Sequence, residues 1–198
     1  MTRAYDRVIA WRGNMQKTMQ REIVLPETKP ESEWLRGRAV KKVSPKRTHA
    51  VLQLWFGRKL EDWSAGRGVV GSEWRFRVAP PGEDIRPLVP DISYLAYDRI
   101  GEATEDELEA PLIPPNLAIE IRSPGDNRRD VEDKVAVLIR AGTDVVIVVN
   151  PKTRTVFAQD ATSRRVFWGD ETFEHPAVPG FTFALPEMFD ALRLRRPS

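Results

Sequence analysis

The chain contains no cysteine and only two histidines among its 198 residues. The lack of cysteine excludes disulfide bonds, thiolate metal sites and a cysteine nucleophile. Two histidines argue against a multi-histidine zinc centre. No apolar run approaches the roughly 20 residues of a membrane-spanning helix, and the N-terminus has no long apolar core of the kind that signal peptides carry. We therefore expect a cytoplasmic protein that makes no membrane contact.

The chain also lacks a strong excess of one charge, because its formal net charge is only +2. Domains that bind nucleic acids usually carry clustered positive charge. Basic residues do gather locally, but each cluster alone is more typical of a solvated surface than of a binding patch. With 41% apolar and 30% charged residues the composition is that of a globular protein, and the length suits one domain with a full core.

The segment 116–150 predicts a strand, a helix and a second strand. Residues 117–121 form a short apolar run between turn residues, and residues 145–149 form the most hydrophobic run of the chain. Between them apolar residues recur at helical spacing from Val131 onward, and Gly142 is a typical helix stop. A strand–helix–strand unit implies two parallel strands, of which the more hydrophobic lies near the centre of a sheet.

The rest of the chain predicts a single α/β domain over residues 33–198, preceded by an extension over residues 1–32. The mixed charge of this extension suits an arm on the surface of the domain. In chain order we expect a hairpin at 33–40, a helix from a Thr48 cap to Ser64, strands at 69–78 and 92–97, a loop at 98–115 with about one helical turn, strands at 155–159, 165–168 and 172–174, and a last helix from Pro186.

Glu120 is out of place in its apolar strand, because a buried carboxylate is costly unless it is paired or bound to a metal. Alternation along the strand puts it on the same face as Arg122. An ion pair with Arg122, or with Lys134 on the following helix, would satisfy the carboxylate. A metal ion would satisfy it equally, so the residues that accompany Glu120 decide which alternative is favoured.

Asp91, Glu120 and Lys134 form a set that suits phosphodiester hydrolysis. Asp91 follows Pro90 at the start of a predicted strand, and Lys134 lies on the helix after the strand of Glu120. Two carboxylates on neighbouring strands can hold a hard divalent cation, which polarises a phosphate and lowers the pKa of a bound water. A nearby lysine can orient that water or offset charge that develops on the phosphate. This chemistry requires neither cysteine nor histidine.

An ordered set of short motifs surrounds these residues: Glu33 with Gly37, Ser44-Pro45 with His49, Val89-Pro90-Asp91, the run from Pro115 to Ile121, Ser123-Pro124, Asp130, Lys134, Ala141-Gly142, Asn150-Pro151 and Pro179-Gly180-Phe181. With these motifs the chain resembles the PD-(D/E)XK nuclease superfamily, and within it the Uma-two family of restriction-endonuclease-like proteins, over roughly residues 33–192. The resemblance implies a restriction-endonuclease-like fold, an α/β fold in which helices flank a central mixed sheet. It also implies Mg²⁺, or Mn²⁺ in its place, bound by Asp91 and Glu120. Lys134 would be the catalytic lysine, and Glu33 would help to bind metal or to orient water.

One position departs from the superfamily pattern. The superfamily lysine usually stands two residues after the second acid, where this chain has Arg122. An arginine is always charged and is a poor proton shuttle, so it is not an equivalent replacement. The related family carries its lysine on the following helix, at the position of Lys134. Arg122 then either neutralises Glu120 or contacts a phosphate, and the first role is favoured.

Three further residues have candidate roles near these motifs. Asp130 precedes Lys134 by one helical turn and either pairs with it or orients it. Glu73 is a further candidate acid near the site. His49, at the start of a helix, is more typical of a structural or surface histidine.

Three functions are compatible with these residues. The leading hypothesis is a Mg²⁺-dependent DNA endonuclease, with Asp91 and Glu120 as metal ligands, Lys134 as the charge stabiliser and Glu33 as a helper. The main alternative is a catalytically silent module of the same fold that binds nucleic acid or forms a dimer, which Arg122 and the low net charge favour slightly. A third is a metal-dependent hydrolase with another substrate. DNA is the expected partner, and a homodimer is expected by analogy, because cutting both strands of a duplex favours two active sites.

Overall fold

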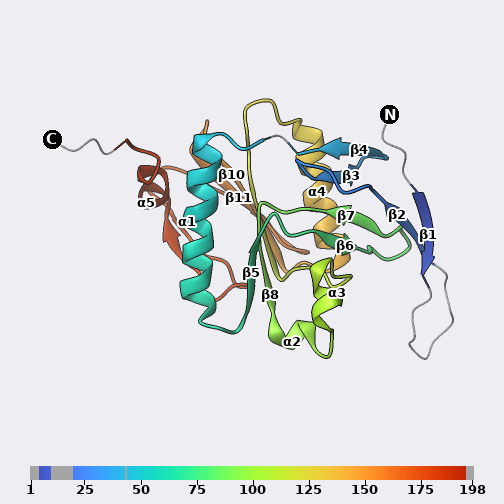
Figure 1. Ribbon diagram of the computed structural model, residues 1–198. Helices are drawn as coiled ribbons and strands as arrows, with labels where there is room; N and C mark the ends of the chain where they lie inside the picture. Colours follow the sequence, from blue (N-terminus) through green and yellow to red (C-terminus); the bar gives the residue numbers. More distant parts are fainter. Residues whose placement is uncertain (1–4, 10–19, 43, 195–198) are drawn as a thin grey trace.

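A computed structural model describes residues 5–9, 20–42 and 44–194, and its centre is a six-stranded mixed sheet (Figure 1). The strand order is β12-β11-β10-β9-β8-β5. β9 and β10 are parallel, and the other neighbouring strands in this sheet are antiparallel. The strands are β5 (Gly68–Ser72), β8 (Ile92–Ala96), β9 (Leu117–Ile121), β10 (Val145–Asn150), β11 (Thr155–Gln159) and β12 (Arg164–Phe167).

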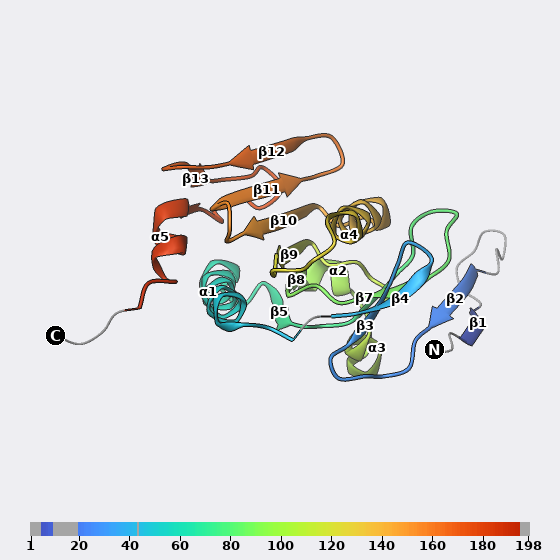
Figure 2. The same cartoon turned by 90° about the horizontal axis from the view of Figure 1, so that it is seen from above.

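Two long helices cover opposite faces of this sheet, α1 (Arg47–Ser64) and α4 (Arg128–Ala141), as Figure 2 shows. Successive side chains of a strand point to opposite faces, so the central strands feed two separate cores. Ile119 of β9 packs in the core that contains Phe56 of α1, whereas its neighbour Ala118 packs in the core on the side of α4. The predicted α/β fold with a central mixed sheet flanked by helices is confirmed.

The prediction for segment 116–150 is also confirmed in detail. β9 and β10 run parallel with α4 between them, and Glu120 is the register partner of Val148. Asn127 caps the start of α4 by accepting a hydrogen bond from the amide of Arg129. Gly142 ends the helix in a left-handed conformation, with φ of 105°. The helix stop predicted at Gly142 is therefore confirmed, and Asn127 adds a cap at the other end of α4.

The smaller elements surround the sheet at both ends, and α5 lies beside α1 (Figure 2). None of the helices in the described part of the chain is long and apolar enough to cross a membrane. The remaining elements are the paired strands β1 (Tyr5–Ile9) and β2 (Gln20–Val24), β3 (Ser32–Leu35) and β4 (Arg38–Lys41), β6 (Phe76–Val78) and β7 (Arg86–Leu88), β13 (Thr172–Phe173) and β14 (Phe183–Ala184), and the helices α2 (Tyr97–Ile100), α3 (Glu105–Glu109) and α5 (Leu185–Asp190).

The hairpin β3–β4 confirms the turn predicted around Gly37, and it packs near α4 rather than joining the six-stranded sheet. Polar contacts attach it to α4. The guanidinium groups of Arg36 and Arg38 pair with Asp130 at 3.3 and 2.6 Å, and the amide of Arg36 donates to a carboxylate oxygen of Asp133 at 3.0 Å. The hairpin is thus held where its residues can reach the C-terminal end of β9.

The single strand predicted over residues 69–78 is wrong, because the chain divides there into β5 and β6. Glu73 interrupts it with a left-handed φ of 53°. β5 pairs with β8, whereas β6 pairs with β7 in a separate two-stranded sheet. The indole of Trp74 donates to the carbonyl oxygen of Leu108 at 2.9 Å, which anchors the bend. Alternation of apolar and charged residues indicated which side chains turn inward, but it does not reveal a change of partner strand.

Several predicted boundaries are also corrected. α1 begins at Arg47 and has no side-chain cap, so the predicted Thr48 cap is wrong. The strand predicted at 92–97 ends at Ala96 because Tyr97 begins α2. The loop predicted at 98–115 contains a second short helix, α3. Its capping box, in which Thr104 and Glu107 satisfy each other's backbone amides, is a start signal that the acidic composition obscured.

The end of the predicted extension is packed against the domain. Ile23 and Leu25 are buried, and the amide of Ile23 donates to the carbonyl of Ile85 at 2.8 Å. Residues 1–4 and 10–19 lie outside the described residues. A division of the chain at residue 32 stays a prediction.

Two glycines give a matched test of the packing around the sheet. A methyl group at Gly68 would lie 2.6 Å from the Tyr94 ring and 2.8 Å from Cα of Ala96, and closer still to the carbonyl oxygen of Leu95. We expect Gly68→Ala to lower the free energy of unfolding by about 1–3 kcal/mol through overpacking. At Gly57, inside α1, the methyl group meets nothing within 4 Å outside its own helix. Gly57→Ala should instead raise stability by up to about 1 kcal/mol, as urea denaturation will show; equal effects would contradict this packing.

Candidate active site

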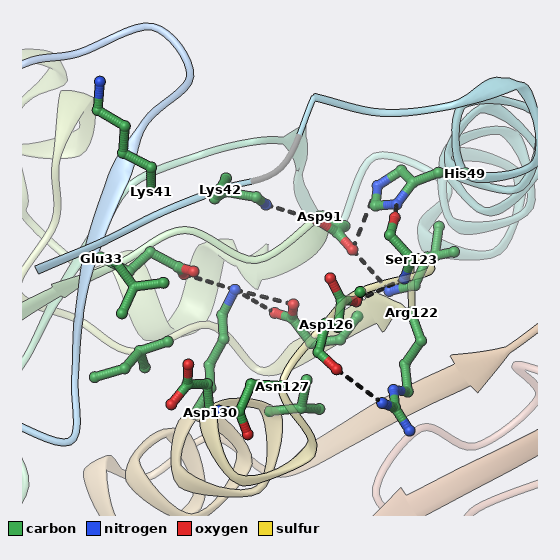
Figure 3. A pocket seen from close by; sticks show the side chains of 17 residues that line it. Glu33, Lys41, Lys42, His49, Asp91, Arg122, Ser123, Asp126, Asn127 and Asp130 are labelled. Carbon is green, nitrogen blue, oxygen red and sulfur yellow. Dashed lines mark hydrogen bonds and ion pairs between the residues drawn. The ribbon is translucent and has the colours of Figure 1, made fainter.

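A pocket of about 210 Å³ lies between the hairpin β3–β4, the end of β9 and the first turns of α4 (Figure 3). The residues predicted as the site line it together, although they come from four different parts of the chain: Glu33, Asp91, Glu120 and Lys134. Each is at most 8% exposed. Charged side chains this deeply buried require partners, so their contacts define what the pocket can do.

Lys134 is the centre of one half of the pocket. Its ammonium nitrogen lies 2.6 Å from a carboxylate oxygen of Glu33 and 2.8 and 2.9 Å from the two oxygens of Glu120. It also donates to the carbonyl oxygen of Val89 at 2.8 Å. β9 presents Glu120 on the face that α4 covers, and Lys134 lies on the side of α4 that faces the sheet. Glu33 of β3, which also accepts from the amide of Val89 at 2.7 Å, completes the group.

Lys42 is the centre of the other half. Its ammonium lies 2.6 Å from Oδ1 of Asp91 and 3.0 Å from Glu73, and it donates to the same carbonyl of Val89 at 2.8 Å. The second oxygen of Asp91 accepts the amide of Ile121, which follows Glu120, at 2.7 Å. This backbone contact fixes the Asp91 carboxylate at the end of β9.

Lys42 is the residue that sequence reasoning missed. In the sequence it stands in a basic cluster with Lys41, which suggested solvated surface. The two-residue alternation of side chains along the hairpin was the signal that could have identified Lys42. Val40 faces the core, and Lys42 follows it by two residues, so both point the same way. Lys42 is only 10% exposed at its side chain, and Lys41 is exposed.

His49 also belongs to the site, so the expectation of a structural or surface histidine is corrected. It is 8% exposed, and its Nδ1 lies 3.1 Å from the hydroxyl of Ser123. Its Nε2 lies 3.5 Å from Oδ2 of Asp91 and makes no hydrogen bond within the described part of the chain. His49, in the first turn of α1, thus directs a buried imidazole nitrogen without a hydrogen-bond partner in the described residues toward Asp91 (Figure 3).

The two halves together carry an excess of negative charge. Four carboxylates face two ammonium groups across the site, those of Glu33, Glu73, Asp91, Glu120, Lys42 and Lys134. Glu120 shows the effect most clearly: burial raises its pKa to about 8, the charge of Lys134 opposes this rise, and the charge of Asp91 adds to it. Without a further cation Glu120 keeps its proton near neutral pH.

Asp91 and the two lysines remain charged. Burial favours neutral Asp91, but the imidazole of His49 at 3.5 Å and the charge of Lys42 outweigh burial and lower the pKa of Asp91. Burial likewise disfavours charge on both lysines, yet Asp91 raises the pKa of Lys42 and Glu120 raises that of Lys134. Mutual attraction therefore keeps Asp91 and the two lysines charged, whereas burial lets Glu120 hold its proton to a higher pH than an ordinary glutamate.

The donor set fits a divalent cation. One ligand atom each from His49, Glu73 and Asp91 lies within 4.8 Å of the others. Oε1 of Glu120 is a buried oxygen that accepts no hydrogen bond among the described residues, although it lies 2.8 Å from the ammonium of Lys134. Carboxylate oxygens are the ligands that Mg²⁺ and Mn²⁺ prefer. Asp91 is common to the predicted pair with Glu120 and to the group with His49 and Glu73.

Two predicted roles are wrong. Within the described residues Arg122 makes no ion pair with Glu120, which pairs with Lys134 instead; the guanidinium of Arg122 donates to the carbonyl of Asp126 at 3.3 Å. Asp130 neither pairs with nor orients Lys134, because Arg36 and Arg38 of the hairpin take its carboxylate. The spacing of these residues was compatible with both expected pairs, and the position of the hairpin decided against the second.

A model of the Uma2 family, which bears the description "Putative restriction endonuclease", matches residues 19–186 of this chain. The chain belongs to the Uma2 family. A crystal structure from Anabaena variabilis ATCC 29413, described as that of a putative nuclease belonging to DUF820, superposes with a TM-score of 0.76 at 25% identity, covering 85% of this chain and 95% of the other. No curated protein matches the chain. The restriction-endonuclease-like fold of this Uma2 protein brings Glu33, Asp91, Glu120 and Lys134 to one pocket, together with Lys42, which the resemblance did not indicate.

The raised pKa of Glu120 has a consequence for stability in this Uma2 protein. The folded state holds the proton more tightly than an ordinary glutamate with a pKa of 4.5 does. The stabilisation that results is complete below about pH 4.5 and is lost as the pH rises through about 8. In EDTA, we expect the wild type to lose at least about 1.4 kcal/mol relative to Glu120→Gln between these values, the energy of one pKa unit. Urea denaturation across this range measures the difference, and a constant difference would contradict the buried, proton-holding carboxyl.

Proposed function

We propose that the protein is a Mg²⁺-dependent DNA endonuclease that hydrolyses phosphodiester bonds. The arrangement of Lys134 carries this proposal, because its buried ammonium lies between Glu33 and Glu120 in the same pocket as Asp91. Acids that can hold a divalent cation, beside a fixed positive charge, are what phosphodiester hydrolysis needs. Membership of a family with the description "Putative restriction endonuclease", and the likeness to a protein described as a "putative nuclease", support the same reaction.

Asp91 and Glu120 are the proposed metal ligands, and His49 and Glu73 are close enough to Asp91 to contribute. A divalent cation supplies Lewis-acid polarisation of the phosphate and a more acidic water. Asp91 suits the task because it is ionised and is fixed by the amide of Ile121. Glu120 suits it because a second cation nearby would compensate its charge and let it lose its proton.

The remaining residues hold charged groups in place or balance their charge. Lys134 is held from two sides by Glu33 and Glu120, so its ammonium needs little rearrangement to stabilise charge that develops on a phosphate oxygen. Glu33 is proposed as the group that holds Lys134 in place. Lys42 neutralises Asp91 and Glu73 from the opposite side. A homodimer and a cytoplasmic location stay predictions.

A second candidate function, a silent module of the same fold, is favoured by one observation. The two lysines already give each carboxylate of the cluster a cationic partner, so the pocket can be stable without metal. Such a module would bind nucleic acid or a second copy of the chain without cutting.

Incubation of supercoiled plasmid with the wild-type protein separates the two functions. We expect nicking with Mg²⁺ or Mn²⁺ and none in EDTA. We also expect Mn²⁺ to raise the melting temperature, because a ligand that binds only the folded state stabilises it. A protein that melts cooperatively, is not stabilised by either ion and leaves the plasmid intact would be the silent module.

A further inference from the structure

We propose that a second hollow beside the active site binds a backbone phosphate of the nucleic acid, next to the phosphate at which the chain is cut. Three basic residues line this hollow: Lys46, Arg122 and Lys152. This inference rests on the proposed function for its substrate, a polynucleotide. It also assigns a role to Arg122, which stands where the superfamily pattern has its lysine.

The hollow encloses about 650 Å³ and joins the active-site pocket directly. The two share a wall of five residues: His49, Arg122, Ser123, Gly125 and Asp126. A phosphate in the active site belongs to a chain that carries a phosphate at every nucleotide, so an adjoining hollow is well placed to receive the next one. This hollow begins at the residue that contacts His49 of the active site, Ser123.

The charge of the hollow suits a phosphate. It is lined by three cations and one acid, Asp126, whose carboxylate already accepts the amide of Ser123. Lys46 and Lys152 are exposed, and neither has an acid partner among the described residues. Both ammonium groups are therefore available to a ligand.

Arg122 is only partly used by the protein itself. Its guanidinium makes one long hydrogen bond, at 3.3 Å to the carbonyl of Asp126, and its buried Nε has no partner in the described part of the chain. A guanidinium offers a planar fork of donors that matches two oxygens of a phosphate. Because Glu120 contacts Lys134 and not Arg122, the guanidinium of Arg122 is left for a ligand.

A third hollow that Arg122 also lines, between α4 and the strands β11 and β12, is less suited to this role. Its Arg128 is paired with Glu132 at 2.7 Å, and its Arg164 lies over the ring of Phe157. The cations there are already engaged, which favours the hollow of Lys46 and Lys152.

The test measures binding rather than cutting. Fluorescence anisotropy of a short labelled DNA duplex, in EDTA and over a range of salt concentrations, gives the slope of log Kd against log salt. We expect the double variant Lys46→Ala/Lys152→Ala to bind more weakly and to reduce this slope by about 1 for each lysine. The control Lys29→Ala/Arg58→Ala removes the same charge from exposed residues that line none of these hollows, and it should keep the wild-type slope.

Arg122→Lys tests the third member, because it keeps the charge and removes the planar fork. We expect weaker DNA binding without faster plasmid nicking; faster nicking would mean that position 122 serves as the superfamily lysine, which would overturn its role here. A slope that falls no more in Lys46→Ala/Lys152→Ala than in the control, or a wild type that binds no DNA, would overturn the phosphate site. Because binding is measured in EDTA, a protein that binds through this hollow but never nicks plasmid would refute only the proposed nuclease.

Discussion

Asp91→Asn should reduce metal-dependent nicking of supercoiled plasmid by on the order of 10³-fold. Asp91 is the acid that belongs to both possible ligand groups, and it is held by contacts with Lys42, His49 and the amide of Ile121. Asparagine keeps the size of the side chain but removes the charge that a divalent cation needs. A metal contributes several kcal/mol to such reactions, and each 1.36 kcal/mol corresponds to about a factor of ten in rate.

The matched control is Asp170→Asn, which makes the same change at an exposed aspartate that lines none of the described pockets and should nick at the wild-type rate. The stabilisation of the folded protein by Mn²⁺ should disappear in Asp91→Asn and persist in the control. Equal nicking by both variants would show that the activity comes from another site or from a contaminant, and the proposed function would then fail.

The largest effect on stability is expected for Lys134→Met. Methionine fills similar space, but it leaves Glu33 and Glu120 buried without their shared cation. Removing one partner of a buried ion pair typically costs about 3–5 kcal/mol. The control Lys59→Met breaks the ion pair with Glu187, whose members are 34% and 56% exposed at their side chains, and should cost less than about 1 kcal/mol.

A double variant separates lost charge pairing from poor packing. In Lys134→Met/Glu120→Gln one unpaired carboxylate is removed together with the lysine, so part of the loss should be recovered in urea denaturation. If Lys134→Met is no more costly than Lys59→Met, the buried cluster does not depend on its central cation.

The core of the fold was predictable because its signals are local. The apolar strands β9 and β10, the helical spacing of α4 and the stop at Gly142 are each contained within a few residues. Glu120 was predictable as a site residue for a related reason, since a carboxylate inside an apolar strand requires a partner. The point at which β5 gives way to β6 was not predictable, because it depends on which strand lies alongside.

Only some of the site residues could be predicted from local sequence signals. Asp91, Glu120 and Lys134 were predicted as site residues from the sequence, whereas the packing of the hairpin and of α1 shows that Lys42 and His49 belong to the site as well. The partner of Asp130 shows the same limit, because the helix offers Lys134 one turn away, whereas the folded chain brings Arg38 within 2.6 Å. Ion pairs are chosen by tertiary distance, and sequence spacing reports only those within one element.

Local unfolding of the hairpin β3–β4 would disrupt the site. It brings Glu33 to Lys134 and leads directly into Lys42, yet none of the six central strands pairs with it. Proteins open in cooperative units, and a two-stranded unit outside the central sheet opens at lower free energy than the buried strands of that sheet. Amide hydrogens of the hairpin should therefore exchange faster than those of β9 and β10, and the protein should lose activity on warming before its sheet melts.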